Sequence, residues 1–443
     1  MEDKTMKKIF GFAALLLTLA ACNKNETDIT PVEELSDSKK EGIIITATLA
    51  PKTADTKAVA NNGDNKITVT WAENEHIAIL YEVSGTKYVA DATIISVDAN
   101  GAATIEFTVE SGTADYTACT LVYPAKLSDG TTTVYNDELS GVKDAATLLS
   151  AQDGTLNANL DIRVGAGTIP TTTPSLDVTI QPVAQYSIFQ FTAQDLSGTG
   201  ITPSEFKVSD SEDNVIATVS PSASAFYVAL PALAVGTYWF SATADSKPYI
   251  ASARVTSATS AGTYYQSTVK MATLGDVMAN NGKFYANAAA ATTAGTKALA
   301  MIAYVGSETG ISSLKHGLAI GLKDEDNYGD FTMEHNWAES VCSKKNDPEY
   351  NEYYIAAGHW YLPSKNQWDA MFNSYGGSYG NLNTAITAAG GEALSEGFPY
   401  WTSTEEYVNS AYSITLDPGT GDYYYVIKAP LTETNYVRAV LVF

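Results

Sequence analysis

Thiols and imidazoles are the side chains of this sequence best suited to nucleophilic, redox or metal chemistry. The chain has three cysteines, at positions 22, 119 and 342, and four histidines, at positions 76, 316, 335 and 359. The histidines show neither the spacing of metal ligands nor a neighbouring nucleophile that they could activate. A disulfide between Cys119 and Cys342 is disfavoured, because they lie in different expected domains. The sequence therefore predicts no catalytic residue and no cofactor, although hydrolysis by paired carboxylates stays open.

Cys22 has a different chemistry because of the residues in front of it. Lys7 and Lys8 precede a short apolar run, which stops well before the roughly 20 residues that span a bilayer. The run ends in Leu19-Ala20-Ala21-Cys22, a match to the bacterial lipobox, in which the cysteine thiol is acylated before cleavage. We expect residues 1–21 to be a signal peptide, with a lipid on Cys22 as the only contact with a membrane. An ordinary signal peptide, with a cysteine there by chance, is the alternative.

Charge and composition limit the partners of the mature chain. Residues 22–41 are polar and without periodicity, which is typical of a flexible tether behind the lipid. The chain has 26 basic and 50 acidic residues, a formal net charge of −24. Such a surface repels nucleic acid and anionic headgroups, so nucleic acid is excluded as a partner.

Residues 42–271 alternate apolar and polar side chains with the period of β-strands. Ile43, Ile45, Ala47 and Leu49 form one alternating set, and Ile105, Phe107 and Val109 form another. Strands that follow one another this closely indicate β-sandwiches. A polar stretch near residues 152–174 divides them, so we expect one sandwich over 42–171 and a second over 172–271, with Leu176, Val178 and Ile180 in its first strand.

Residues 272–443 have a different pattern and predict an α+β domain. Ser364 and Gln367 form a capping box before a helix, and Leu382, Ala385, Ile386 and Ala389 share one face of another. Alternating strands surround these helices, and the apolar segment Val437–Phe443 is expected to be buried within the domain.

Several of these segments resemble a known family. Trp71-Ala-Glu-Asn-Glu-His-Ile-Ala-Ile79 and Leu121-Val-Tyr-Pro124 are similar to two strand motifs of fimbrillins, the subunits of type V pili. The last domain resembles the C-terminal module of tip-type fimbrillins, which has a C-type-lectin-like or sulfatase-modifying-factor-like shape. The matching segments are Gly275-Asp276, Gly317-Leu-Ala-Ile-Gly-Leu322, His359-Trp-Tyr-Leu-Pro-Ser364, Gln367-Trp368, Tyr400-Trp-Thr-Ser-Thr-Glu405 and Val437-Arg-Ala-Val440. The resemblance implies a mostly β fold: two tandem fimbrillin-type, transthyretin-like sandwiches followed by an α+β lectin-like domain.

The resemblance also implies a mode of assembly. Family members polymerise by donor-strand exchange: a protease cuts the lipidated precursor after Arg or Lys, its first strand leaves, and a strand from another subunit fills the groove. Here the removable strand would be Ile43–Leu49, and the cut would follow Lys57, or else Lys52 or Lys66. Alternatively, these lysines are ordinary loop residues and the strand stays. A buried Val437–Phe443 leaves no obvious strand to donate, which favours the tip position.

Two sets of residues are candidates for binding a ligand. Tyrosines suit sugar stacking or protein contact, and those expected in loops or at edges are Tyr353, Tyr354, Tyr375, Tyr379, Tyr423 and Tyr424. Asp324, Asp326 and Asp330 resemble part of a calcium loop, but position 335 holds His where the bidentate Glu is expected, so no metal is predicted.

The expected function is therefore that of a non-enzymatic pilus tip subunit at the outer membrane and cell surface. Its partners would be other pilus subunits, joined by donor-strand exchange, and a glycan or protein bound by the last domain. A structural anchor or spacer without a ligand is the alternative, and a surface glycan-processing enzyme is a distant one. Enzymatic sulfatase-modifying factors need a cysteine pair or a cysteine-bound metal, and Cys342 stands alone in its domain.

Overall fold

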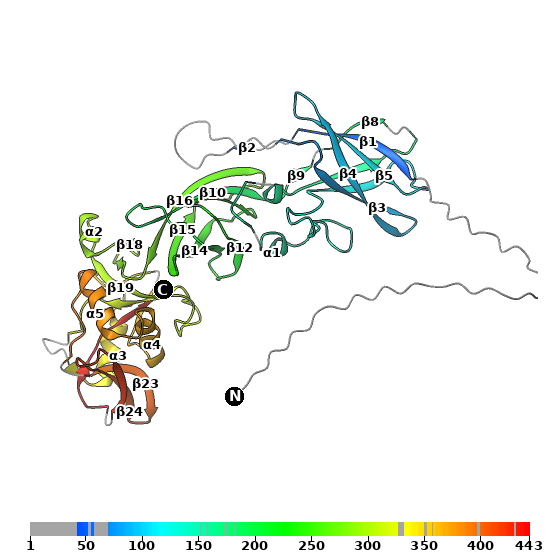
Figure 1. Cartoon of the computed structure of the whole chain (residues 1–443). Coiled ribbons are helices and arrows are strands. Elements are labelled where there is room, and N and C mark those ends of the chain that lie inside the picture. Colours follow the sequence, from blue (N-terminus) through cyan, green and yellow to red (C-terminus); the bar gives the residue numbers. More distant parts are fainter. Residues whose placement is uncertain are drawn as a thin grey trace, which may run out of the picture. The chain divides into compact units, whose positions relative to one another are not determined.

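The computed structural model describes most of the chain beyond the expected tether. The described residues are 42–51, 55–56, 70–150, 152–156, 158–172, 175–180, 182–326, 332–349, 352–356, 358–396, 399–428 and 431–443. The predicted signal peptide, Cys22, Asp330 and the cleavage candidates Lys52, Lys57 and Lys66 lie outside them. The expectation of a mostly β protein with several sheets is confirmed (Figure 1).

The first sheet has eight strands in the order β8-β1-β5-β4-β3-β6-β7-β9. One core lies on a single face of this sheet, with alternate residues such as Ile45, Ile79 and Ile105. The members of that core come from the sheet's own strands and from Trp71, so the sheet closes over its own buried face. The strands are β1 (Ile43–Leu49), β3 (His76–Val83), β4 (Thr86–Val97), β5 (Ala103–Val109), β6 (Thr117–Tyr123), β7 (Arg163–Ile169), β8 (Ser175–Ile180) and β9 (Val183–Ala184).

Strand β3 is buried on both faces. Ile77 and Ile79 belong to the first core, whereas Ala78 and Leu80 face a second one. The connection between β6 and β7 contributes Val134, Leu148 and Leu160 to that second core. It contains a short helix, α1 (Ala145–Leu148), with Asp144 as N-cap, and the single turn η1 (Ala158–Leu160). These helical turns were not predicted, because residues 42–271 show the alternation of β-strands.

The second domain is built around the long strand β16 (Thr263–Thr273). Its residues from Tyr264 to Met271 pair with β10, and its last two pair with β15, so β16 joins two layers. Phenylalanines fill the space between them: Phe191, Phe206, Phe226 and Phe240 have ring centroids 4.9 to 6.2 Å apart. The other strands are β10 (Ser187–Asp195), β11 (Glu205–Ser209), β12 (Val215–Val219), β13 (Ala225–Leu230), β14 (Gly236–Ala244) and β15 (Lys247–Val255).

The boundary between the two sandwiches differs from the expectation. Leu176, Val178 and Ile180 do form a strand, but β8 pairs with β1 and belongs to the first sheet. β9 likewise pairs with β7. The predicted boundary at residue 171 therefore falls inside the first sheet. Alternation indicates that a segment is a strand but does not say which strand it will pair with.

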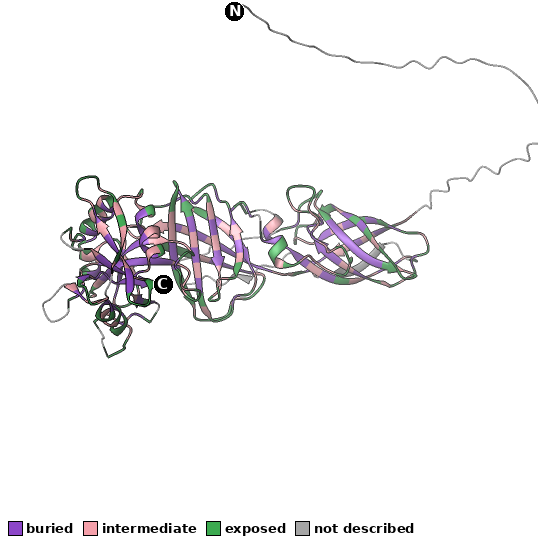
Figure 2. Ribbon diagram, turned by 90° about the horizontal axis from the view of Figure 1, so that it is seen from below, coloured by how far each residue is buried: buried purple, intermediate pink, exposed green. Residues whose placement is uncertain are grey.

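The described residues of the C-terminal domain form two sheets and four helices. The strand orders are β18-β17-β19-β20-β27-β22 and β21-β26-β23-β24-β25. The strands are β17 (Val277–Ala279), β18 (Phe284–Tyr285), β19 (Ala298–Val305), β20 (Gly317–Gly321), β21 (Thr332–Met333), β22 (His359–Tyr361), β23 (Tyr400–Tyr407), β24 (Ser410–Leu416), β25 (Tyr423–Lys428), β26 (Asn435–Tyr436) and β27 (Val440–Val442). Buried residues follow the strands, and exposed ones gather in the connections (Figure 2).

Two of the four helices were predicted. α4 (Lys365–Ser374) begins with the expected capping box of Ser364 and Gln367. α5 (Tyr379–Ala388) buries Leu382 and Ile386 and is followed by Gly390 at a φ of 94°. α2 (Ala288–Thr293) and α3 (His335–Lys344) were missed, and α3 has no side-chain hydrogen bond at its N-cap to mark its start. None of the helices among the described residues has the length and apolar character to cross a membrane.

Asp276 lies in the turn that enters the C-terminal domain, where it accepts a 2.8 Å hydrogen bond from the Thr273 amide. Burial raises the pKa of its carboxyl to about 6, the Thr273 hydrogen bond opposes this, and the charge of Asp195 adds to it. The native pKa exceeds the ordinary value of about 4, so the folded chain holds an extra proton and loses stability as pH rises between these values.

We expect Asp276→Asn, which keeps the acceptor, to stabilise the chain by about 1 kcal/mol at pH 8 and by nothing near pH 3.5. Urea denaturation of both chains at the two pH values measures the difference. An equal gain at both would contradict the assignment.

Candidate functional sites in the first sheet and the C-terminal domain

Strand β1 has two neighbours that hold it unequally. β5 pairs with all 7 of its residues, from Ile43 opposite Val109 to Leu49 opposite Ala103. On the other side β8 runs parallel to β1 and pairs only at Thr46, Thr48 and Leu49, with a shift of register. β1 thus lies between β8 and β5 (Figure 1), and its ladder to β5 is longer and more regular than its ladder to β8.

The side chains of β1 alternate between core and solvent, as predicted. Ile45 and Leu49 are 0% exposed and Ala47 is 4% exposed, whereas Ile44 is 58% exposed. Ile43, at the start of the strand, is half-buried against the same core. Removing β1 would thus open a groove in the first core. The groove would be lined by the core residues that now cover Ile45, Ala47 and Leu49.

The segment behind β1 reaches the second domain. β2 (Asp55–Thr56) pairs in parallel with Thr263 and Tyr264 of β16. A cut after Lys57 would separate both β1 and β2 from the rest of the chain, whereas a cut after Lys52 would leave β2 attached. The two candidate sites therefore differ in what they release.

Strand β27 is held on both sides within the C-terminal domain. It pairs with β20 through Val440, Leu441 and Val442, and the same three residues pair with β22. All three are 0% exposed, as expected for the segment Val437–Phe443. Both sides of this strand are therefore occupied by its own domain.

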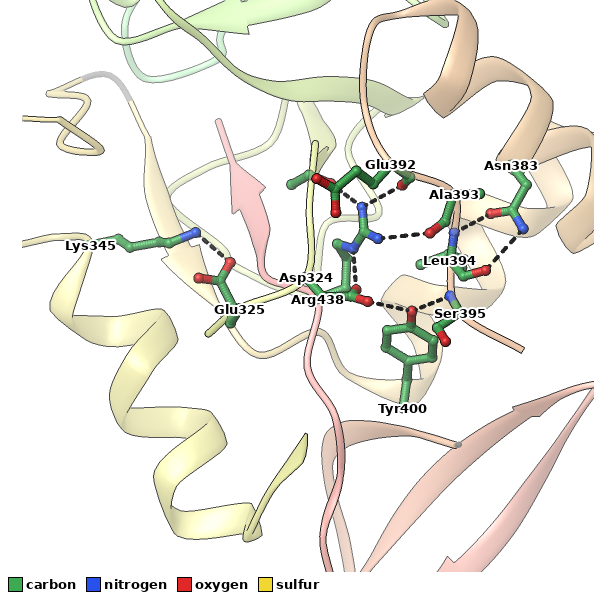
Figure 3. Close-up of polar contacts among 11 residues, drawn as sticks. Asp324, Glu325, Lys345, Asn383, Glu392, Ala393, Leu394, Ser395, Tyr400 and Arg438 are labelled. Carbon is green, nitrogen blue, oxygen red and sulfur yellow. Dashed lines mark hydrogen bonds and ion pairs between the residues drawn. The ribbon is translucent and has the colours of Figure 1, made fainter. Parts of the chain in front are cut away.

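A fully buried arginine lies at the edge of this sheet. Arg438 is 0% exposed, and its Nε donates to Asp324 Oδ1 at 2.7 Å (Figure 3). Its Nη1 donates to the carbonyl oxygens of Gly321 and Glu392, and Nη2 to that of Ala393. The guanidinium therefore ties β20 to the loop after α5. Sequence reasoning treated this segment as apolar and missed the arginine, although a lone charge in an apolar strand is itself a signal of a buried pair.

The Arg438 network includes Asp324, one of the three aspartates that resemble part of a calcium loop. Asp324 receives Arg438 on one oxygen and the Tyr400 hydroxyl, at 3.0 Å, on the other. Asp326 is exposed. Within the described part of the chain, no group of three or more His, Cys, Asp or Glu side chains could hold a metal ion. Asp324 thus has a structural role, because its charge compensates a buried guanidinium.

The six candidate tyrosines do not form one surface. Tyr375, Tyr379 and Tyr423 belong to or pack against one core, with hydroxyls that donate to the Ile302 carbonyl, Glu396 and Asp369 respectively. Tyr353 packs against a different core, and Tyr354 is half-buried. Tyr424 is 52% exposed. Most of these rings therefore serve packing, while Tyr353 borders a cavity.

The two described cysteines are free and buried. Burial raises the pKa of Cys342 well above its ordinary value and that of Cys119 to about 11. Thiolate formation is disfavoured at both positions, so neither is suited to act as a nucleophile. The disfavoured disulfide is not formed, and Cys119 is a small core residue as predicted.

Comparison with known proteins gives similarity at the level of structures alone. No family model and no curated protein matches the sequence. Among solved structures, a fimbrial protein from Bacteroides ovatus is 12% identical, covers 91% of this chain and 100% of its own, and has a TM-score of 0.30. A putative cell adhesion protein from Bacteroides uniformis is 10% identical, with coverage of 52% and 96% and a TM-score of 0.30. A fimbrial assembly protein from Parabacteroides distasonis is 15% identical, with coverage of 51% and 90% and a TM-score of 0.29. At these values the similarity carries no argument about function.

Proposed function

We propose that this protein is a tip subunit of a surface pilus that accepts a strand from the next subunit and binds a surface ligand through residues 272–443. The observation that carries the proposal is the contrast between two strands. β1 has a full ladder to β5 and only a short, irregular one to β8, and it fills a groove with alternate apolar residues. β27 is paired on both sides and fully buried.

An exchanged strand needs backbone groups to bind and pockets to set its register. The ladder of β5 offers the backbone groups, since it now pairs with all 7 residues of β1. The positions of Ile45, Ala47 and Leu49 offer the pockets, since a slip by one residue would place Ile44 and the threonines toward the core. Both requirements support the role of acceptor.

The delivery step follows from the sequence. The precursor is exported with a lipid on Cys22, and a protease cuts after Lys57 or Lys52 to release β1. Lys57 suits the role better, because a cut there also removes β2 from the edge of β16. The mature subunit then leaves its lipid behind and enters the fibre.

Immunogold labelling of native fibres, combined with mass spectrometry of the mature N-terminus, tests the proposal. We expect label against residues 272–443 at fibre ends and an N-terminus that begins after Lys57. Replacing Lys52, Lys57 and Lys66 together by Gln should retain the lipidated precursor and remove the end label. Lys247→Gln, at an exposed position of the second domain, is the matched control and should leave both unchanged.

The alternative is a structural subunit without a ligand, and its signature is different. Label along the shafts would identify a spacer. A native N-terminus that still carries lipidated Cys22 would identify a retained anchor. Either result would contradict the tip assignment.

A further inference from the structure

A cavity of about 460 Å³ opens in the C-terminal domain beside β19 and β20. Its walls come from the α2 region, from the residues that follow β20, and from the loop after α5. This volume lies within the range of small-molecule sites, roughly 300–1,000 Å³, and exceeds what one inorganic anion fills. The cavity adjoins the Arg438 network, since Gly321 and Glu392 line it and also accept hydrogen bonds from that arginine. Its floor is thus held by a buried ion pair.

Three lysines line this cavity: Lys297, Lys323 and Lys345. Among the described residues, Glu392 is the acidic side chain that lines it with them. Two of these lysines have a carboxylate partner, Glu352 for Lys297 and Glu325 for Lys345, so the positive charge open to a ligand comes from Lys323 and from Lys297 when its exposed ion pair opens. A ligand that carries negative charge would be repelled by most of the surface and attracted here.

The three ammonium groups are held in different ways. Lys345 is buried, forms an ion pair with Glu325 (Figure 3), and lies 4.8 Å from the ring centroid of Tyr353 and 4.5 Å from that of Trp360. Its position is therefore fixed by the fold. Lys297 lies 5.0 Å from the same Tyr353 ring, and its partner Glu352 has a side chain that is 59% exposed. An exposed ion pair of this kind is weak, and its lysine can exchange partners at little cost.

Lys323 is exposed, and the three charges act on one another. Burial lowers the pKa of Lys297, and the charges of Lys323 and Lys345 lower it further. The repulsion between like charges held together in this way falls when an anion binds between them. The ammonium groups of Lys297 and Lys323 can therefore move to contact such an anion. Lys345 and Tyr353 stay in place beside them.

The rest of the lining suits a sugar. The Thr292 and Thr296 hydroxyls lie on one wall. Each already donates its proton, to the Ala288 carbonyl and the Asn280 amide oxygen respectively, and can still accept a hydrogen bond from a ligand hydroxyl. Leu299 and Leu322 add apolar surface for the C–H face of a pyranose.

A second cavity, of about 620 Å³, lies over the first sheet and does not share this chemistry. Its lining includes Glu75, His76 and Asp91. His76 is paired with Asp91 at 3.0 Å, and Glu75 accepts the Tyr123 hydroxyl at 2.6 Å. Two carboxylates and one lysine, Lys126, line this cavity, so it lacks the three lysines of the C-terminal one.

We propose that the C-terminal cavity binds one anionic sugar unit, a pyranose that carries a carboxylate or a sulfate, with Lys297 and Lys323 contacting the anionic group. The inference rests on the proposed adhesion function and deepens it by naming a site and a ligand class. Tyr353, expected from sequence to stack on a sugar, instead positions two of the lysines.

Calorimetric titration of the purified chain from residue 22, made unacylated by Cys22→Ser, tests the site. The probes are glucuronic acid, N-acetylneuraminic acid and glucose 6-sulfate, with glucose, inorganic phosphate and a hexaglutamate peptide as comparisons. We expect at least one acidic sugar to bind at least tenfold more tightly than glucose and phosphate, and its affinity to fall as salt is raised. The carboxylate and sulfate probes distinguish the two forms of the anion.

The Lys297→Gln, Lys323→Gln double variant should weaken that binding by about tenfold or more, because charge-assisted hydrogen bonds are lost. Lys283→Gln, at an exposed position of the same domain outside the cavity, should not change it. The proposal is overturned if glucose, phosphate or the peptide binds as tightly as the acidic sugars, or if the double variant binds as well as the parent.

Immunogold labelling of fibre ends tests the tip position separately from sugar binding. The double variant should still appear at fibre ends, because neither lysine belongs to β1 or to the strands that pair with it. Loss of sugar binding with fibre ends still labelled supports this inference. Sugar binding by a chain that is absent from fibre ends would leave the site standing and contradict the tip assignment.

Discussion

Replacing Arg438 by Met is expected to lower the free energy of unfolding of the C-terminal domain by about 3–5 kcal/mol. The change keeps much of the aliphatic volume but leaves the Asp324 carboxylate buried, where the side chain is 11% exposed, without its guanidinium. It also leaves three backbone carbonyls, at Gly321, Glu392 and Ala393, without their donors. Few single substitutions in this chain would remove so many buried interactions.

The measurement is a urea transition followed by tryptophan fluorescence, since Trp360, Trp368 and Trp401 lie in the cores of that domain. Arg254→Met, at an exposed position of β15, is the matched control and should change stability by less than about 0.5 kcal/mol. Adding Asp324→Asn to Arg438→Met should recover part of the loss, because no charge then remains unpaired. A loss below about 1 kcal/mol in the single variant would show that the network contributes little.

A chain that begins at residue 58, without β1 and β2, is expected to lose most of the stability of its first domain and to regain it with a peptide. Full burial of an Ile or Leu side chain contributes about 1.5–3 kcal/mol, so Ile45 and Leu49 together give on the order of 5 kcal/mol. A peptide of residues 42–51 can restore both these contacts and the ladder to β5. The midpoint of thermal unfolding should rise with peptide concentration and then saturate.

Two peptide variants make the test specific for register. Ile45→Asp places a charge at a 0% exposed position and should weaken binding by about 100-fold or more. Ile44→Asp makes the same chemical change at a 58% exposed position and should bind within a few-fold of the parent. Equal binding of the two variants, or no effect of the parent peptide, would contradict strand replacement.

Local patterns in the sequence predicted local structure well. The alternation of β1 and β5, the capping box of α4 and the apolar face of α5 all depend on neighbours within a few residues. Such patterns are legible because one face of each element is buried against the core.

Pairing between distant segments could not be predicted in the same way. β8 has the alternation of a strand, yet nothing in it says that it joins β1, more than 120 residues earlier, rather than the second domain. The partners of Arg438 come from two separate stretches of chain, residues 321–324 and 392–393, and the lysines of the C-terminal cavity come from three. Tyrosine clustering in the sequence drew the prediction toward sugar stacking, whereas the fold uses most of those rings for packing.

The position of β27 also governs the order in which the C-terminal domain can form. β20 and β22 are joined only through β27, although they precede it by about 120 and 80 residues. β22 therefore cannot join the four strands β18-β17-β19-β20 until β27 has taken its place between β20 and β22. Contacts of such long sequence separation slow folding, because a large loop must close before they form. Closure of the six-stranded sheet is thus expected to be a late step in the folding of this domain.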